Sequence, residues 1–200
     1  MALANAIWKP VSVHEMVAEF LFGEREKEEF SFIPPGTPVI DAPNVNSPHE
    51  NHTRLRILYH GRAQFFGEVP PDTRWYEVKF LTDNELDDLY VVARVSPWMT
   101  ADPNDMRLRR VAARCPDKLK DPPGDWRRPI LWGHETAGPF SIFEGNNRLI
   151  AYASSPSPPG LCIPVFVGLS PTPCVWHIHD AVQPIANHLW TRSRWPKFQF

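Results

Sequence analysis

A clear helical pattern begins at Ser12, near the beginning of the chain. Apolar side chains recur at intervals of three and four residues, at Val13, Met16, Val17, Phe20 and Leu21. This spacing places them on one face of a helix. Ser12 and Glu15 fit a capping box at its start. We expect the charged run at 24–29 to be the solvated end of this helix, and the proline-containing run at 33–36 to stop it.

Residues 34–66 show two different patterns. Residues 34–53 contain prolines and asparagines without a sustained hydrophobic period, which is typical of a long surface connection. Residues 55–66 are rich in residue types that favour β-structure. The sequence therefore predicts a strand there, with Gly61 as a turn or bulge inside it.

Strict alternation predicts the next strand over residues 75–81. One face carries Tyr76, Val78 and Phe80, and the other carries Trp75, Glu77 and Lys79. Thr82 followed by Glu85 then matches the start of a helix. We expect Leu86, Leu89 and Tyr90 to face inward from that helix. A further short helix is predicted at 106–113.

The stretch from 129 to 169 shows the most complete order of elements. It predicts a strand at 129–132, a turn at 133–138, a second strand at 139–144, a helix at 146–154 and a third strand at 163–167. Two strands that flank a helix normally form a parallel crossover unit. Pro164 cannot donate to a ladder, so the third strand should start late or lie at an edge of the sheet.

Composition and length favour a single α+β domain. Two hundred residues suffice for one good core. The 23 prolines, against 10 glycines, indicate stiff connections between short elements. We expect residues 1–74 to form an N-terminal helical and β extension packed on a core at 75–180. The tail at 181–200 should pack on this core through Trp190 and Trp195.

Charge and cysteine content favour a cytoplasmic protein that does not bind nucleic acid. The net charge is −2, with 21 basic and 23 acidic residues, whereas a nucleic-acid-binding chain is usually strongly basic. Three cysteines without framework spacing favour a reducing compartment. The first ten residues do not fit a signal peptide, and we expect no membrane span. The pattern does not predict an oligomeric state.

Residues 144–148 form the best candidate for a ligand-binding turn. Gly145 stands between a predicted strand and a predicted helix, where it allows a tight turn and close approach of a ligand. A helix N-terminus favours an anion, and Arg148 adds a guanidinium that fits phosphate or carboxylate. Asn146 or Asn147 can cap the helix. The alternative is a capped helix whose arginine pairs with Glu144, and the residues alone leave both interpretations open.

The same stretch resembles the ParB/sulfiredoxin-like superfamily. The resemblance rests on the order of elements in 129–167, on the acidic-Gly-x-x-Arg motif at 144–148, and on the Ile-Pro-Val-Phe-Val strand at 163–167. With the strand and helix at 75–90 it covers roughly residues 75–180. It implies an α+β fold with a small mixed sheet and short helices.

The resemblance also implies a function. In this superfamily the Gly-x-x-Arg turn binds nucleotide phosphates, so Gly145, Asn146, Asn147 and Arg148 would contact the phosphates of ATP or CTP bound with Mg²⁺. The implied function is a nucleotide-dependent enzyme, with phosphotransfer as the candidate reaction and Glu144 as metal ligand or base.

The motif also departs from its relatives. Sulfiredoxins place a cysteine after the glycine, ParB proteins a glutamate, and free serine kinases two histidines, where this chain has Asn146 and Asn147. An amide is neither a nucleophile nor a general base at neutral pH. The alternative is therefore a binding or regulatory module that has the fold without catalysis.

Histidines supply the remaining candidates for chemistry. His134 and Glu135 lie in the turn before the motif strand, and in the resembling fold this turn could approach the ligand turn and supply further catalytic residues. The alternative is a plain surface turn. His177 and His179 would project to one face of an extended segment, which is a possible start for a metal site. A third ligand is not evident from the sequence, so we interpret this pair as structural and predict no metal site.

Overall fold

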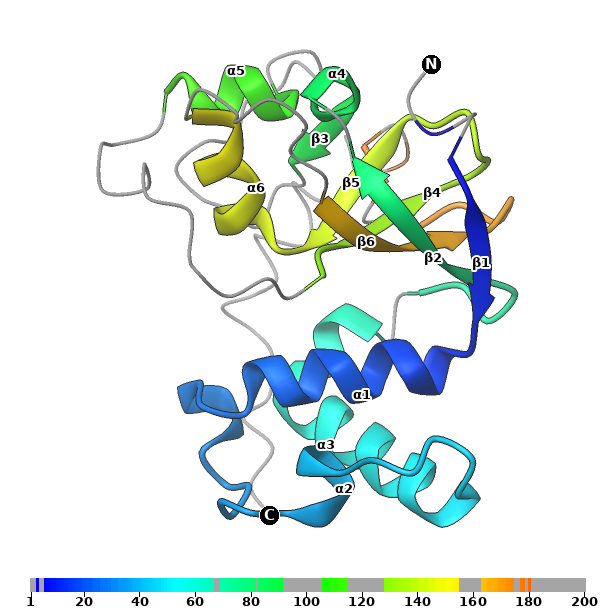
Figure 1. Cartoon of the computed structure of the whole chain (residues 1–200), viewed down its shortest axis with the longest axis vertical. Helices are drawn as coiled ribbons and strands as arrows, with labels where there is room; N and C mark the ends of the chain where they lie inside the picture. Colours follow the sequence, from blue (N-terminus) through cyan, green and yellow to red (C-terminus); the bar gives the residue numbers. More distant parts are fainter. Residues whose placement is uncertain are drawn as a thin grey trace.

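The computed structural model describes residues 3, 6–66, 69–81, 83–91, 106–114, 128–154, 163–174, 177, 178 and 180. These residues form three layers, with a mixed β-sheet between two groups of helices (Figure 1). The predicted Thr82 cap, His179 and the C-terminal tail with Trp190 and Trp195 lie outside the described residues.

Within the part of the chain that the structure describes, the sheet has six strands in the order β1-β2-β6-β4-β5-β3. The strands are β1 (Trp8–Val11), β2 (Arg74–Leu81), β3 (Leu89–Val91), β4 (Ile130–Gly133), β5 (Phe140–Glu144) and β6 (Ile163–Leu169). Neighbours pair antiparallel in β1–β2, β2–β6 and β4–β5, and parallel in β4–β6 and β3–β5. The prediction of an α+β fold with a mixed sheet is confirmed.

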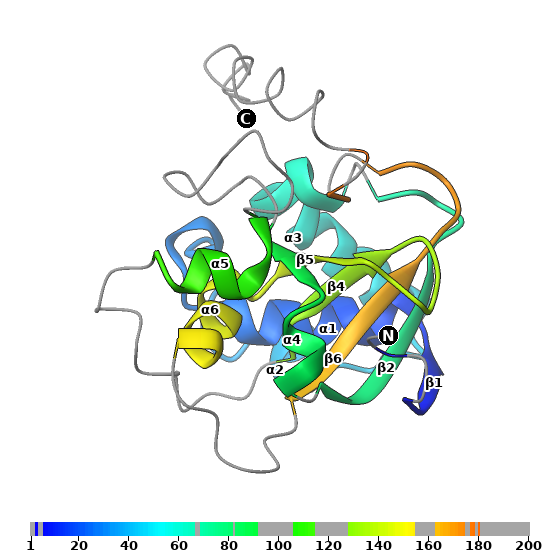
Figure 2. The ribbon, with the colours of Figure 1, turned by 90° about the horizontal axis from the view of Figure 1, so that it is seen from above.

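The helices are short apart from two. They are α1 (Val13–Glu24), the 3-10 helix η1 (Glu28–Phe30), α2 (Pro38–Asp41), α3 (Pro48–Phe66), α4 (Asp83–Leu86), α5 (Leu108–Ala112) and α6 (Asn146–Ser154). Helices α1, α2 and α3 lie on one side of the sheet, while α5 and α6 lie side by side on the other (Figures 1 and 2).

Two hydrophobic clusters fill the two interfaces. One joins α4, α5 and α6 to the sheet and includes Val78 and Leu131, and the other joins the N-terminal helices to the sheet and includes Trp75 and Trp132. Val78 and Trp75 lie on opposite faces of β2, so the predicted alternation of that strand is confirmed for both. Residues before position 74 thus share a core with the sheet, and β1 adds an edge strand that the hydrophobic pattern did not predict.

The predicted start of the first helix is confirmed in atomic detail. The Ser12 hydroxyl accepts a hydrogen bond from the Glu15 amide at 3.2 Å, and the Glu15 carboxylate accepts one from the Ser12 amide at 2.6 Å. This reciprocal pair satisfies two amides at the helix N-terminus. The helix ends at Glu24, earlier than predicted, and the charged run continues as a turn and η1.

The prediction of a strand at 55–66 is wrong, because these residues belong to α3. The interpretation of 34–53 as a connection is also wrong in part, since α2 and the first six residues of α3 lie there. The buried positions have the spacing of a helix, because Arg54 and Leu58 are four residues apart and both fully buried. Gly61 is a packing position, because a Cβ atom there would lie 2.4 Å from the Phe30 ring.

The prediction of a parallel crossover from β5 to β6 is wrong. Strand β5 folds back on β4 as an antiparallel pair, and β6 then pairs in parallel with β4, which therefore lies between them. Strand β6 is also internal, although its ladder with β4 begins only at Phe166, after Pro164. Leu89 and Tyr90 are buried as predicted, but they belong to β3 and not to a helix.

Candidate functional site

The turn between β5 and α6 has the backbone that its glycine predicts. Gly145 has φ +93°, which other residues adopt only with strain. Its carbonyl accepts the Leu149 amide at 3.0 Å, so Gly145 occupies the N-cap position itself. The prediction that Asn146 or Asn147 caps the helix is therefore wrong, and both asparagines lie in its first turn.

The two charged residues of the motif contact each other. Nη2 of Arg148 donates to Oε2 of Glu144 at 2.7 Å, across one turn of chain. The alternative that the residues left open, an arginine paired with Glu144, is thus present in the structure. Asn147 is exposed, whereas the side-chain oxygen of Asn146 is buried and has no hydrogen-bond partner among the described residues.

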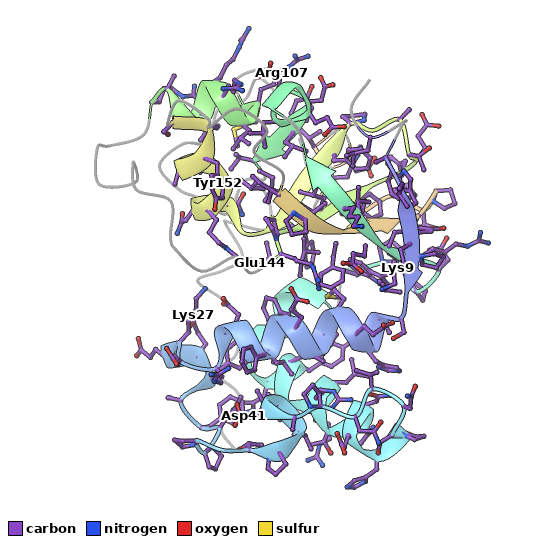
Figure 3. All side chains as sticks on the ribbon, viewed as in Figure 1. Lys9, Lys27, Asp41, Arg107, Glu144 and Tyr152 are labelled. Atoms are coloured by element: carbon purple, nitrogen blue, oxygen red, sulfur yellow. The ribbon has the colours of Figure 1, made fainter. Side chains whose placement is uncertain are left out.

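A small pocket with a cavity volume of about 10 Å³ lies beside this ion pair, between the sheet and α1. Its charged lining comprises Glu19, Glu24, Glu144, Arg128 and Arg148. The remaining lining is apolar, from Met16, Phe20, Ile130 and Phe166. Figure 3 shows Glu144 on the side of the sheet that faces α1, and Lys27 near the C-terminal end of that helix. Helix α1, which the superfamily resemblance does not cover, therefore supplies two of the carboxylates.

Burial changes the chemistry of Glu144. Removal from water raises the pKa of this carboxyl above its ordinary value, the Arg148 guanidinium opposes the rise, and the nearby Glu24 carboxylate adds to it. Glu144 is thus a carboxyl group that holds a proton more readily than a solvated one. It has the properties of a general acid or base, or of a ligand for a cation that relieves its charge.

The other two predicted catalytic residues lie elsewhere. His134 and Glu135 follow β4 directly, whereas Glu144 pairs with Ile130 at the opposite end of the same strand. The expectation that their turn approaches the ligand turn is therefore wrong, because an antiparallel pair places its connecting turn at the far end. Glu135 is exposed, and His134 takes part in a different group of side chains.

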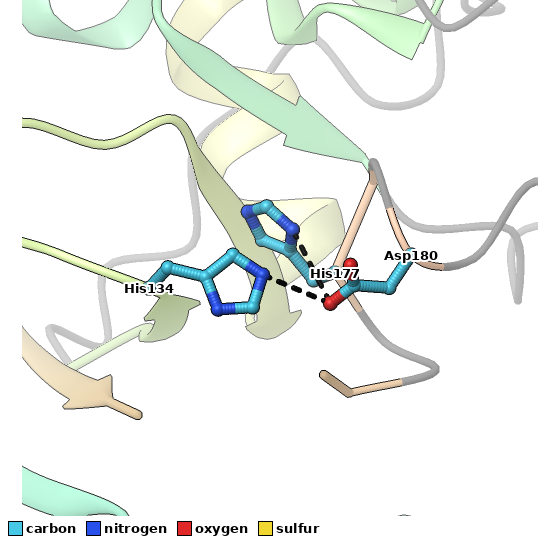
Figure 4. A group of neighbouring side chains, drawn as sticks. All are labelled: His134, His177 and Asp180. Carbon is cyan, nitrogen blue, oxygen red and sulfur yellow. Dashed lines mark ion pairs between the residues drawn. The ribbon is translucent and has the colours of Figure 1, made fainter. Parts of the chain in front are cut away.

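That second group consists of His134, His177 and Asp180 (Figure 4). Nε2 of His134 lies 3.0 Å from Oδ2 of Asp180, and Nδ1 of His177 lies 3.7 Å from the same oxygen. The sequence pattern indicates His177 and His134 as separate candidates and does not reveal their contact. Strand order would have revealed this contact. Because β4 and β6 are parallel neighbours, the residues that follow them meet at one edge of the sheet.

Comparison of the chain with protein-family models, with curated proteins and with solved structures finds no match. The ParB/sulfiredoxin-like resemblance therefore rests on the motif residues and on the order of the elements. The structure adds the geometry of the turn, the pocket and the histidine group, from which function has to be inferred.

Proposed function

We propose that this chain is a nucleotide-dependent enzyme of the ParB/sulfiredoxin-like kind, with phosphotransfer as its candidate reaction. The phosphates of ATP or CTP would bind with Mg²⁺ at the Gly145–Arg148 turn. The observation that supports this most directly is the left-handed Gly145, which presents the N-terminus of α6 beside a charged pocket.

The turn supplies suitable groups for phosphate. The first amides of α6 have no acceptor within the helix, and the helix dipole favours negative charge at that end. Arg148 lies in the same first turn and lines the pocket. Its guanidinium has five N–H donors, so it can contact a phosphate oxygen while it retains Glu144.

The charge of the pocket lining favours a phosphate that is bound together with Mg²⁺. Three carboxylates line the pocket, and each is already paired with a cation: Glu19 with Arg128, Glu24 with Lys27 and Glu144 with Arg148. The pocket therefore offers no net positive charge to a phosphate that lacks its metal. A Mg²⁺ ion bound to the nucleotide offsets the carboxylates, and Glu144 is the one nearest Arg148 and the turn. Its role would be to bind the ion, directly or through water, or to accept a proton from the acceptor substrate.

The size of the pocket limits how deeply the nucleotide enters it. Its cavity volume of about 10 Å³ has room for about one water molecule. The phosphates and the metal ion would therefore bind at the rim of the pocket, beside the turn, and the base and ribose would lie farther out.

The first test is thermal unfolding with and without nucleotide. Millimolar ATP or CTP with Mg²⁺ should raise the melting temperature, because a ligand that binds only the folded state stabilises it. Arg148→Ala should abolish the rise, and EDTA should reduce it. Arg56→Ala, at an exposed position on α3, is the matched control and should respond as the wild type does. Absence of a rise with every nucleotide tested would contradict the proposal.

A specific observation favours a second candidate, a binding or regulatory module without catalysis. Asn146 and Asn147 occupy the positions at which the relatives carry reactive side chains, and Asn147 is exposed.

Turnover distinguishes the two candidates. If the chain is an enzyme, radiolabelled nucleotide should be converted in the presence of candidate acceptors. If Glu144 accepts the proton, Glu144→Gln should retain the melting-temperature rise and lose conversion, since an amide cannot accept the proton. If Glu144 binds the ion, the same variant should lose both. Nucleotide that binds but stays intact over hours would favour the regulatory module.

A further inference from the structure

The second group of side chains, at the far end of β4, has the features of a metal site. His134 directly follows β4, and His177 and Asp180 lie on the segment after β6. One ligand atom from each lies within 4.8 Å of the other two. His177 is 1% exposed, while His134 and Asp180 are 31% and 22% exposed, so the group is anchored on one side and accessible on the other.

Hydrogen bonds determine which ring nitrogen of each histidine carries a proton. Nδ1 of His134 lies 2.9 Å from the carbonyl oxygen of Ser170, and Nε2 of His177 lies 3.1 Å from that of Pro139. A carbonyl oxygen can only accept, so both of these nitrogens are N–H donors. In a neutral ring the other nitrogen, Nε2 of His134 and Nδ1 of His177, then has a lone pair. Metal-binding histidines are usually oriented in this way by a backbone carbonyl.

The two lone pairs face the same carboxylate. Oδ2 of Asp180 lies 3.0 Å from one nitrogen and 3.7 Å from the other. Three groups that can only accept do not gather without positive charge, which is either a second proton on a histidine or a metal ion. In a tetrahedral zinc site, with bonds of about 2.0 to 2.2 Å, neighbouring ligand atoms are about 3.3 to 3.6 Å apart. The distances from Oδ2 of Asp180 to the two histidine nitrogens, 3.0 and 3.7 Å, lie on either side of this range.

The surroundings hold the group in place. The rings of His134 and His177 pack against the Trp132 ring system in T-shaped arrangements, with centroids 5.1 and 5.5 Å away. The backbone amide of Cys174 donates to Oδ2 of Asp180, the same oxygen that faces the two histidines, at 2.9 Å. The hydroxyl of Ser170, whose carbonyl orients His134, donates in turn to Asp72 at 2.7 Å. Such outer contacts fix the ligands before the ion binds.

We propose that His134, His177 and Asp180 bind a divalent transition-metal ion of the zinc type. Two imidazole nitrogens and one carboxylate oxygen form a donor set that suits zinc. Among the described residues no fourth histidine, cysteine, aspartate or glutamate joins the group. The competing explanation is an ion pair between a protonated His134 and Asp180.

The test uses the full chain after dialysis against a chelator. Titration with Zn²⁺ in a calorimeter should show one saturable site, and Co²⁺ should give the visible absorption of a four-coordinate site with nitrogen and oxygen ligands. Asp180→Asn and His134→Ala should each weaken zinc binding by about 100-fold or more. His52→Ala, an exposed histidine on α3, is the matched control and should bind as the wild type does.

Two experimental outcomes would contradict the proposed metal site. Circular dichroism verifies that the two variants are folded, and the cobalt spectrum of the wild type gives an answer that depends on no variant. A wild type without a saturable site, or an Asp180→Asn variant that binds zinc as tightly as the wild type, would overturn the proposal. Either outcome would identify the group as a hydrogen-bonded histidine–aspartate cluster.

Discussion

At the scale of single residues, the candidate site depends most on Gly145. Its φ of +93° lies in the region that residues with a side chain adopt only with strain, and a Cβ atom there would lie 3.0 Å from Cβ of Pro129. The residue that precedes β4 thus closes one side of the turn. Gly145 is required for backbone conformation and for packing at the same time.

Gly145→Ala should therefore destabilise the fold by about 2 kcal/mol or more, through strain together with the contact on Pro129. Gly36→Ala is the matched control, since Gly36 has φ +76° and a Cβ atom added to it would have nothing within 4 Å. It should cost about 1 kcal/mol from strain alone. Urea unfolding of both variants measures the difference. Equal losses would show that the contact with Pro129 contributes nothing.

At the scale of elements, Arg54 connects α3 to the chain before it. Its fully buried guanidinium donates to the carbonyl oxygens of Val39 and Asn44, at 3.1 and 3.0 Å, and to Glu50 at 3.1 Å. These bonds attach α2 and the following loop to the helix. A buried arginine explains how a helix with few apolar residues forms part of a core.

Arg54→Met should destabilise the protein by about 3 kcal/mol, because it keeps most of the volume but leaves buried carbonyl oxygens without a donor. Arg56→Ala, exposed on the same helix, should change the stability by less than about 0.5 kcal/mol. Thermal or urea unfolding tests both. A loss below about 1 kcal/mol for Arg54→Met would mean that apolar packing alone holds α3.

The same elements show what hydrophobic patterns can predict. The strand at 75–81, the capped first helix and the order of elements from β4 to β6 follow from local periodicity and capping residues, and the structure contains them. The pattern does not predict helix α3, because the buried face of α3 is marked by Arg54 and Gly61, which no apolar pattern counts. It does not predict strand β1 either, because Pro10 argues against a strand, although an edge strand tolerates proline.

At the scale of the whole molecule, pairing between distant segments decides the sites. The sequence predicts the Gly145 turn from residues that are adjacent in the chain. It does not predict the carboxylates that α1 adds to the pocket or the contact between His134 and Asp180, since both arise from strand order. Local patterns do not encode strand order, so they do not reveal that the residues after β4 and after β6 meet at one edge of the sheet.

Strand β4 touches both candidate sites, and this has a consequence for their chemistry. Pro129 lies against the Gly145 turn just before the strand, and His134 joins the histidine group just after it. Five residues of extended chain span roughly 17 Å at about 3.3 Å per residue. An ion held by the histidines is therefore too distant to coordinate a phosphate at Gly145. The Mg²⁺ that accompanies a nucleotide and the zinc-type ion would be separate ions, each with its own dissociation constant.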